Sequence, residues 1–337
     1  MKEENNNSTP LANLDTALRP RTLQEYFFQG RIKPQLFSSL QILLQAAQER
    51  GEPLDHILFY GPPGLGKTTL AQIIAHEMQS QIKVTSGPVI ERVGDLAAIL
   101  SNLNHGDILF IDEIHRLRKN IEEIMYAAME DFALDIVLGK GPSAQTLRLE
   151  LPRFTIIGAT TRISLISAPL RDRFGVIHRL QFFSPADLTL IIKRSAQQLQ
   201  LSLTDSACRE IARRARGTPR IANRLLKRLR DYSQIQRWGK IDEKQIKQAF
   251  DLLGVDEKGL TTSDRHYLQT LIEKFNGGPV GLKTISSALA EDQATIEEVV
   301  EPFLLQLGLI KRTPRGRHAT PRAYQHLQQP LAKKRLL

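Results

Sequence analysis

The run Gly61-Pro-Pro-Gly-Leu-Gly-Lys-Thr68 decides the fold class of this chain, because it matches the phosphate-binding pattern G-x-x-x-x-G-K-[ST]. An apolar segment at 56–60 precedes the run, and a helical pattern over 67–79 follows it. In that setting the backbone can approach a phosphate closely, and N–H groups at the helix start point toward it. We expect Lys67 to reach the β- and γ-phosphates of ATP and Thr68 to bind Mg²⁺. The glycines that allow the close approach are Gly61, Gly64 and Gly66.

Short apolar segments recur on both sides of this run. They alternate with helical patterns as far as residue 183, which is typical of a doubly wound α/β domain. Their near-continuous apolar character favours a parallel sheet that is covered on both faces. One helix is expected to start at Asn120, because Asn120 and Glu123 resemble a capping box. The predicted strands are 56–60, 82–85, 107–111, 154–158 and 176–180.

Acidic and hydroxyl side chains follow two of these strands. Asp112 and Glu113 come directly after 107–111, at the carboxyl edge where ligands of such sheets bind. Asp112 can hold Mg²⁺ through water, and Glu113 can orient and deprotonate an attacking water; capping of a helix is the alternative. Thr161 ends the next strand and can contact the γ-phosphate or that water, unless it only satisfies the strand end. His115 is interpreted as a structural residue at a helix start.

Arginines near the fifth strand and in a later helix are further candidates. An arginine presented to a neighbour's γ-phosphate stabilises transition-state charge, and either Arg171 or Arg173 could serve. Thr218 is the expected N-cap of another helix, which places Arg220 in its first turn. The helix dipole disfavours a cation there, so contact with the nucleotide and a surface salt bridge are both open.

An insertion at 134–151 interrupts the strand–helix alternation. Residues 134–138 and 146–151 alternate apolar and polar side chains around Gly139-Lys-Gly-Pro142, which predicts a β-hairpin with one exposed face. A decorative hairpin and a docking surface for a partner protein are equally compatible with this pattern.

Two further domains are expected after residue 183. An all-helical lid comes first, and three short helices with a basic β-hairpin then outline a winged helix, with a type I turn at 313–316. The predicted lid helices are 186–200, 204–216, 219–236 and 243–253, and those of the winged helix are 263–275, 282–289 and 294–307. The predicted domains are a disordered tail at 1–16, an ATPase domain at 17–183, a lid at 184–256 and a winged helix at 257–337.

The charge distribution favours a polyanionic partner. The formal net charge is +10, and the segment from Lys311 to the C-terminus holds eight Lys or Arg residues and no Asp or Glu. A second basic cluster runs from Arg209 to Arg230; solubility alone is the alternative explanation. On the predicted wing, the side chains suited to phosphate contact or minor-groove insertion are Lys311, Arg312, Arg315 and Arg317.

Several classes of protein are excluded by composition. No apolar run approaches the length of a membrane helix, and the segment 1–10 lacks the apolar stretch of a signal peptide. Cys208 is the single cysteine, so no internal disulfide can form, which suits a reducing cytoplasm.

Together these motifs resemble the RuvB family of bacterial Holliday-junction branch-migration motors, a family of AAA+ ATPases. The resemblance extends from about Ala17 to Ala323. Its most particular runs are Arg216-Gly-Thr-Pro-Arg-Ile-Ala-Asn-Arg224 and Arg312-Thr-Pro-Arg-Gly-Arg317, beside Ala17-Leu-Arg-Pro20, Asp112-Glu-Ile-His-Arg-Leu117, Met129-Glu-Asp131, Gly158-Ala-Thr-Thr-Arg162, Pro169-Leu-Arg-Asp-Arg-Phe-Gly175 and Gly277-Gly-Pro-Val-Gly-Leu282.

The resemblance implies more than the spacing shows. It implies homohexameric rings on duplex DNA that flank a four-way junction bound by a RuvA-type protein, with a RuvC-type resolvase as an indirect partner and the 134–151 hairpin docking on RuvA. It makes Arg173 the trans arginine finger and Arg220 the lid arginine, with Arg312 and Arg317 touching DNA. Its nucleotide-site residues are Leu18, Arg19, Gly64, Lys67, Thr68, Thr69, Glu130, Asp131 and Phe132.

Three positions depart from the family pattern: Phe28 stands for a usual Gly, Phe183 for a usual Tyr near the nucleotide, and Gln293 for a frequent Arg. Two other functions share much of this layout: a DNA-binding ATP switch like a replication initiator, and a protein-remodelling ATPase. The basic wing argues against the second, and the exposed hairpin favours the motor over the first.

Overall fold

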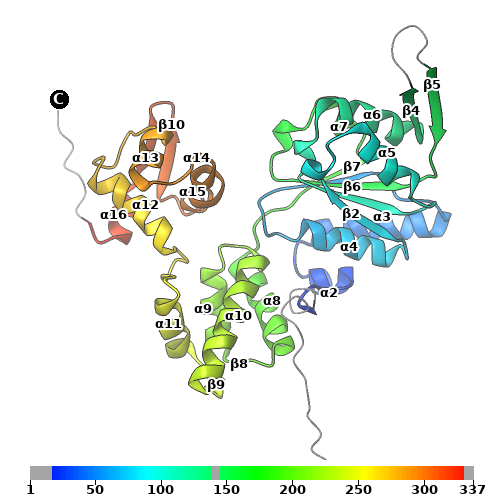
Figure 1. Cartoon of the computed structure of the whole chain (residues 1–337). Helices are drawn as coiled ribbons and strands as arrows, with labels where there is room; N and C mark the ends of the chain where they lie inside the picture. The colour runs from blue at the N-terminus through cyan, green and yellow to red at the C-terminus, as the bar shows by residue number, and fades with distance from the viewer. Residues whose placement is uncertain (1–16, 139–144, 330–337) are drawn as a thin grey trace, which may run out of the picture. The chain divides into compact units, whose positions relative to one another are not determined.

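The computed structural model describes residues 17–138 and 145–329, which form two compact units (Figure 1). The first unit takes the described residues up to Gln198 together with Thr218–Asn223. The second takes Leu199–Gly217 and the described residues from Arg224 onward. Residues of the predicted lid therefore occur in both units. The predicted tail at 1–16 lies outside the described residues.

A five-stranded parallel sheet forms the centre of the first unit. Its strand order is β2-β3-β6-β1-β7, and every neighbouring pair is parallel. The central strand β1 pairs on one side with β6 and on the other with β7, with Ile57 opposite Ile157 and Val176. This arrangement confirms the predicted doubly wound α/β domain. The strands are β1 Ile57–Tyr60, β2 Ile82–Ser86, β3 Ile108–Asp112, β6 Thr155–Thr160 and β7 Val176–Arg179.

Helices cover both faces of this sheet. Figure 1 shows α5, α6 and α7 on one face and α3 and α4 on the other. Leu109 and Ile111 of β3 share a core cluster with Leu96 of α5 and Met125 of α6, whereas Phe110, fully buried, points to the opposite face. Burial on both faces explains why the strands are continuously apolar. The helices are α2 Leu23–Phe27, α3 Pro34–Arg50, α4 Lys67–Glu77, α5 Val93–Ser101, α6 Lys119–Glu130, α7 Ala168–Asp172 and α8 Pro185–Gln198, with short 3-10 turns at Gly87–Val89, Ile114–Arg116 and Ile163–Leu165.

The start of α6 corrects one prediction. The helix begins at Lys119 with Arg118 as N-cap, and that cap makes no side-chain hydrogen bond, so the predicted capping box at Asn120 is wrong. Leu117 is only 7% exposed and packs in the core one helical turn before the buried Ile121. Burial of both side chains favours a helix that starts before Asn120. Packing thus overrides the local capping signal.

The predicted hairpin is confirmed as the antiparallel pair β4 Ala133–Leu138 and β5 Gln145–Glu150. Leu134 is buried in the core of the first unit, whereas Leu147 on the paired strand is 51% exposed. The predicted loop from Gly139 to Pro142 lies outside the described residues. The hairpin therefore presents an apolar side chain to solvent, as its alternating pattern indicated.

The second unit combines helices of the predicted lid with a winged helix. Two short strands, β8 Ser202–Leu203 and β9 Lys240–Ile241, pair in parallel, so the expectation of an all-helical lid misses a small ladder. Ile241 is fully buried and its carbonyl accepts a hydrogen bond from Thr204 N at 3.0 Å, which joins the two segments. The helices here are α9 Asp205–Arg214 and α11 Glu243–Leu252; α10 Pro219–Gln236 starts in the first unit and continues in the second.

The winged-helix part has one more helix than predicted and one irregular turn. The predicted helix at 294–307 contains a π-helical turn, Ile296–Val300. Pro302 follows it, and proline lacks the N–H that would bond one α-helical turn back. The elements are α12 Thr262–Glu273, α13 Leu282–Leu289, α14 Gln293–Thr295, α15 Glu301–Gln306, β10 Ile310–Thr313, β11 Gly316–Ala319 and the unpredicted α16 Pro321–His326.

The wing is the antiparallel pair β10–β11, closed by the two-residue loop Pro314–Arg315. Arg312 and Arg317 lie directly opposite each other across the pair. The predicted basic hairpin is therefore present at the expected residues. No helix among the described residues is long and apolar enough to cross a membrane.

Candidate functional site

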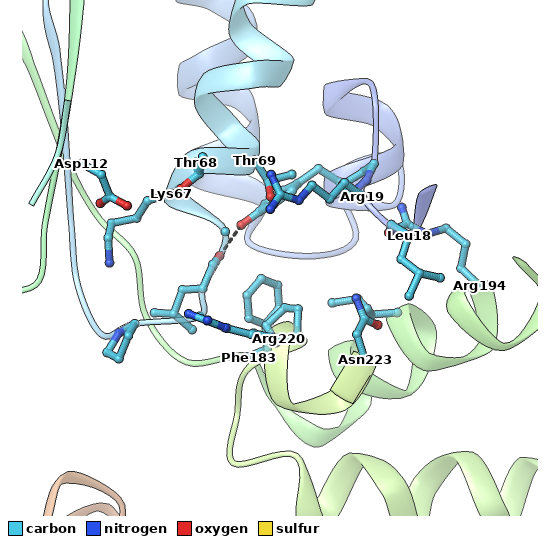
Figure 2. Close-up of a pocket in the computed structure, with 18 of the residues that line it drawn as sticks. Leu18, Arg19, Lys67, Thr68, Thr69, Asp112, Phe183, Arg194, Arg220 and Asn223 are labelled. Atoms are coloured by element: carbon cyan, nitrogen blue, oxygen red, sulfur yellow. Dashed lines mark hydrogen bonds between the residues drawn. The ribbon is translucent and has the colours of Figure 1, made fainter. Parts of the chain in front are cut away.

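A cavity of ≈ 430 Å³ lies at the carboxyl edge of the sheet in the first unit (Figure 2). This volume suits a nucleotide-sized ligand. The P-loop and the ends of β3 and β6 form one end of the cavity, while the N-terminal segment, α8 and the start of α10 form the other. The predicted site residues that line it are Leu18, Arg19, Gly64, Gly66, Lys67, Thr68, Thr69, Asp112, Glu113, Thr161, Phe183 and Arg220.

The P-loop adopts backbone conformations that favour glycine. Gly64 and Gly66 have φ of 79° and 93°, and a Cβ on Gly61 would lie 2.3 Å from the carbonyl oxygen of Leu180. Gly61 does not line the cavity, but its carbonyl accepts a hydrogen bond from Lys67 Nζ at 2.8 Å. The loop thus ends at the first residue of α4, where backbone N–H groups can meet phosphate oxygens.

Lys67 is the buried cation of this loop. It is 7% exposed, and its ammonium also donates to the carbonyl of Pro62 at 3.0 Å. Burial lowers the pKa of Lys67, and the nearby carboxylates of Glu113 and Asp112 oppose this shift without cancelling it. A bound phosphate would place negative charge beside this desolvated ammonium and would stabilise its protonated form.

The two carboxylates lie where β3 ends. Glu113 N donates to Asp112 Oδ1 at 3.0 Å, and Glu113 itself is left-handed with φ of 47°. Because β6 is the neighbour of β3, Thr161 lies beside them and donates to Glu113 Oε2 at 3.3 Å. The structure therefore brings together Glu113 and Thr161, the residues predicted to act on the attacking water, and Asp112, the residue predicted to hold Mg²⁺.

Thr160 has a different environment from Thr161. It is fully buried, and its Oγ1 accepts a hydrogen bond from Arg162 N at 2.9 Å and lies 2.9 Å from His115 Nδ1. Of the two threonines only Thr161, the candidate for contact with the γ-phosphate or the attacking water, lines the cavity. His115 lies in a 3-10 turn behind the carboxylates.

Thr68 and Asp112 line the same cavity and fit a magnesium ion chemically. Hydroxyl and carboxylate oxygens are ligands that Mg²⁺ takes, usually together with waters and substrate phosphates. A dedicated all-protein cage is not expected for this ion, and the described residues contain no group of three or more potential His, Cys, Asp or Glu ligands.

The start of α10 lies over the P-loop. Ile221 N lies 3.4 Å from Thr218 Oγ1, as expected for the predicted N-cap, and Arg220 N lies 3.4 Å from the carbonyl of Gly64. A Cβ on Gly64 would lie 3.1 Å from Arg220 Cβ. Arg220 therefore lies at the mouth of the phosphate loop with an exposed side chain, where it can contact a bound nucleotide.

Several cavity residues carry no motif and were missed. Tyr26 donates to the carbonyl of Leu65 at 2.8 Å, and burial raises the pKa of its hydroxyl. Arg194 donates to the carbonyl of Leu18 at 3.1 Å, and burial lowers its pKa. These side chains come from helices with ordinary patterns, so no local signal marks them. Ile191 is a third lining residue outside the motifs. The sequence marks Phe28 only as a departure from the family pattern. The lining residues that belong to quoted motifs but were not predicted individually are Pro20, Pro63, Leu65, Pro219 and Asn223.

Two departures from the family pattern lie at this cavity. Phe28 ends α2 in a left-handed conformation with φ of 48°, a geometry that glycine adopts more easily. Phe183 is 4% exposed and packs under the ammonium of Lys33, 3.9 Å from its ring centroid. Gln293, the third departure, begins α14 in the second unit.

Besides Gly61, four predicted nucleotide-site residues lie outside this cavity. Arg173 pairs with Glu130 at 3.0 Å, donates to the carbonyl of Pro169 at 2.7 Å and stacks over Tyr126 at 4.7 Å. The other two predicted residues, Asp131 and Phe132, follow Glu130 at the start of the hairpin. The structure therefore does not bring this group to the chain's own P-loop.

On the wing, two of the predicted DNA-contacting arginines are already paired. The carboxylate of Glu301, fully buried, pairs with Arg312 at 2.5 Å and with Arg317 at 2.9 Å. Arg317 also pairs with Glu297 at 2.9 Å, whereas Arg315 lies exposed in the loop at the tip.

Some arginines of the basic cluster from Arg209 to Arg230 are buried or partly buried and paired with carboxylates, so they do not contribute to a basic surface. Arg214, 5% exposed, pairs with Glu210, and Arg216 pairs with Asp264 and lies over the ring of Phe303 at 4.5 Å. The Arg216–Asp264 pair joins the end of α9 to α12, and the Arg214–Glu210 pair lies within α9, so these two guanidiniums have internal partners and the whole cluster is not a surface for a polyanion.

Comparison with known proteins gives matches in all three parts of the chain. The Holliday junction DNA helicase RuvB P-loop domain matches residues 18–180, the RuvB AAA lid domain 183–256 and the RuvB C-terminal winged helix domain 257–328. The Holliday junction branch migration complex subunits RuvB of Chloroflexus aggregans and Chloroflexus aurantiacus are each 57% identical over 323 residues, which is 96% of this chain and 91% of theirs. The structure of the Thermotoga maritima RuvB Holliday junction branch migration motor superimposes with a TM-score of 0.83 at 47% identity, over 93% of this chain and 99% of that one. The chain therefore belongs to the RuvB family of P-loop ATPases.

Proposed function

We propose that this chain is the ATP-driven subunit of a hexameric ring on duplex DNA, which drives branch migration of Holliday junctions in recombination and repair. One observation carries the proposal: a single cavity gathers Lys67, the Asp112–Glu113 pair, Thr161 and Arg220, in a chain that matches RuvB along all three parts. Phosphoryl transfer asks mainly for positioning and charge stabilisation, and these residues supply both.

Six residues of the cavity have a part in ATP hydrolysis. Lys67 and the N–H groups at the start of α4 bind phosphate oxygens. Glu113 orients a water and takes its proton, and Thr161 holds Glu113 by the hydrogen bond to Oε2. Thr68 and Asp112 would hold Mg²⁺, which would supply positive charge to the phosphates. Arg220 places a second cation at the mouth of the loop.

A neighbouring subunit would complete the site. Arg173 and the segment from Glu130 to Phe132 lie together outside the chain's own cavity, so they can serve the nucleotide of an adjacent chain. Within the chain, the Glu130 carboxylate pairs with the Arg173 guanidinium. A phosphate of a neighbour's nucleotide can replace this carboxylate, because both anions accept hydrogen bonds from the same N–H donors. This supports a ring, since each chain then offers a pocket on one face and an arginine on another.

The remaining partners follow from the other surfaces. We propose that the hairpin at 134–151, with Leu147 exposed, docks on a RuvA-type protein, and that Arg312, Arg315 and Arg317 contact duplex DNA. A RuvC-type resolvase would act on the same junction without direct contact, and the compartment is the cytoplasm. The domain boundaries we propose are 17–183, 184–256 and 257–337.

The test is dissociation of a synthetic four-way junction with ATP, Mg²⁺ and a RuvA-type protein. Wild-type protein should dissociate the junction, and Glu113→Gln should bind ATP but fail to hydrolyse it. If wild type binds ATP and duplex DNA tightly and turns over slowly without moving the junction, the motor proposal is wrong and a DNA-bound ATP switch replaces it.

A further inference from the structure

His115 contacts the catalytic carboxylate from behind. Its Nδ1 lies 3.1 Å from Glu113 Oε2 and 2.9 Å from Thr160 Oγ1, and the side chain is 8% exposed. Thr160 is the last residue of β6, and Thr161 follows it into the cavity. The ring therefore lies between the proposed general base and the strand end that leads into the cavity.

The proton on the ring is assigned by its partners. An ionised carboxylate can only accept hydrogen bonds, so Nδ1 carries a proton when it contacts Glu113. Thr160 Oγ1 already accepts from Arg162 N at 2.9 Å, and a hydroxyl has a second lone pair to offer Nδ1. The Nδ1 proton is thus shared between Glu113 and Thr160.

The backbone around Glu113 is held in a rarely populated conformation. Its φ and ψ of 47° and 45° are left-handed, a state that residues other than glycine adopt mainly where the surroundings impose it. Gly87 is one such constraint, because a Cβ there would lie 2.5 Å from the carbonyl oxygen of Glu113. This fixed backbone determines the direction in which the Glu113 side chain leaves the chain. The contacts of the carboxylate with neighbouring side chains then determine the orientation of its two oxygens.

We propose that His115 is a positioning residue for ATP hydrolysis, which holds the Glu113 carboxylate together with Thr161 and links it to the end of β6. Among the contacts of the described chain, His115 and Thr161 both meet Oε2 of Glu113. Oε1 is then the oxygen that receives the proton of the attacking water. The inference rests on the proposed function, in which Glu113 is the general base.

The position of the contact nitrogen supplies matched variants. The amide of asparagine places its nitrogen where Nδ1 of histidine lies, one bond beyond Cγ, whereas glutamine reaches the region of Nε2. His115→Asn therefore keeps donors for Glu113 and Thr160, and His115→Gln moves the donor away. His115→Phe keeps the ring volume in this nearly buried position and removes the nitrogen.

Steady-state ATP hydrolysis by the full-length protein, with Mg²⁺ and duplex DNA, tests the inference. We expect His115→Phe and His115→Gln to lower kcat about tenfold, the rate equivalent of one lost hydrogen bond to a charged group. The KM and the directly measured ATP affinity should stay within about twofold, because the histidine does not line the cavity. His115→Asn should recover most of kcat, and all variants should unfold near the wild-type temperature.

A second background separates this inference from the proposed function. In Glu113→Gln, His115→Phe should lower the residual rate no further, because a positioning residue acts only through its partner. An equal additional loss there would overturn the inference, as would wild-type kcat in His115→Phe or failure of His115→Asn to recover activity. Undiminished turnover in Glu113→Gln alone would instead overturn the catalytic role of Glu113.

Discussion

Replacing Glu301 with glutamine should destabilise the winged-helix part of this chain, because Glu301 is a fully buried carboxylate with three partners. Its Oε1 accepts from Tyr267 Oη at 2.8 Å and from Arg317 Nε at 2.9 Å, and its Oε2 accepts from Arg312 Nε at 2.6 Å. Burial alone would lower the pKa of Arg317, but its hydrogen bonds and charge attraction with Glu301 outweigh burial and raise it. The carboxylate is therefore the counterion of a desolvated guanidinium.

The loss of stability in Glu301→Gln depends on which guanidiniums lose their counterion. Breaking a buried ion pair from one side destabilises a protein by about 3–5 kcal/mol. Glutamine keeps the volume and one acceptor, Arg312 can return to water because its side chain is 42% exposed, and Arg317 keeps Glu297. We therefore expect a loss near the lower end, about 3 kcal/mol.

Glu297→Gln is the matched control. Glu297 lies one helical turn before Glu301, but its side chain is 41% exposed and pairs, within the described part of the chain, with Arg317 alone. Removing the same charge there should change stability by less than about 1 kcal/mol.

Native-state hydrogen exchange on the full-length chain measures both effects locally, which avoids assuming two-state unfolding of a multidomain protein. The amides of β10 and α12 should lose about 3 kcal/mol of protection in Glu301→Gln and keep it in Glu297→Gln. Equal losses in the two variants would refute the reasoning, since burial of the carboxylate would then have no consequence.

Three further outcomes are expected. Arg173→Ala mixed with Lys67→Ala should recover ATP hydrolysis that neither variant has alone, since one supplies an intact pocket and the other an intact arginine; a mixture no better than its parts contradicts action in trans. Arg315→Ala should weaken duplex binding evenly across sequences and reduce the salt slope by about one, and sequence-selective loss would instead indicate base readout. Burial lowers the pKa of Lys33 from 10.5 to about 8, with the Asp187 charge opposing the shift. Between these values the unfolded chain binds more protons than the folded one, so wild type should gain stability with rising pH relative to Lys33→Met. Identical pH slopes in chemical denaturation would contradict that assignment.

The sheet was predictable because each of its strands is a short apolar run between turn signals. The segment predicted at 107–111 is β3 at Ile108–Asp112, and the segment at 56–60 is β1 at Ile57–Tyr60. The incorrect predictions concern features that are set by tertiary contacts and not by the local sequence. The start of α6 is set by the packing of Leu117, and the β8–β9 ladder joins residues 202 and 240, which no local pattern connects.

The cavity was predictable to the extent that its residues stand at strand ends. In a parallel sheet the carboxyl ends of neighbouring strands meet, so Asp112 and Thr161 had to lie close once β3 and β6 were neighbours. Tyr26 and Arg194 could not be found this way, because a helix presents side chains in every direction and tertiary packing selects those that reach the cavity. His115 had a visible place in the sequence, but its contact with Glu113 depends on the left-handed turn between them.

The wing shows why charge counts in a sequence do not assign DNA contacts. Arg315 and Arg317 are both arginines and lie two residues apart. Arg317, however, would have to exchange its hydrogen bonds with Glu301 and Glu297 for a phosphate, whereas Arg315 is exposed and has no ion pair among the described residues. Loss of Arg315 should therefore weaken DNA binding alone, while loss of Arg317 leaves the buried Glu301 carboxylate with one cation fewer and should weaken binding and folding together. Measuring both properties for both variants would divide the basic wing into a contacting arginine and a supporting one, a distinction that depends on Glu301, a buried helix residue outside the hairpin.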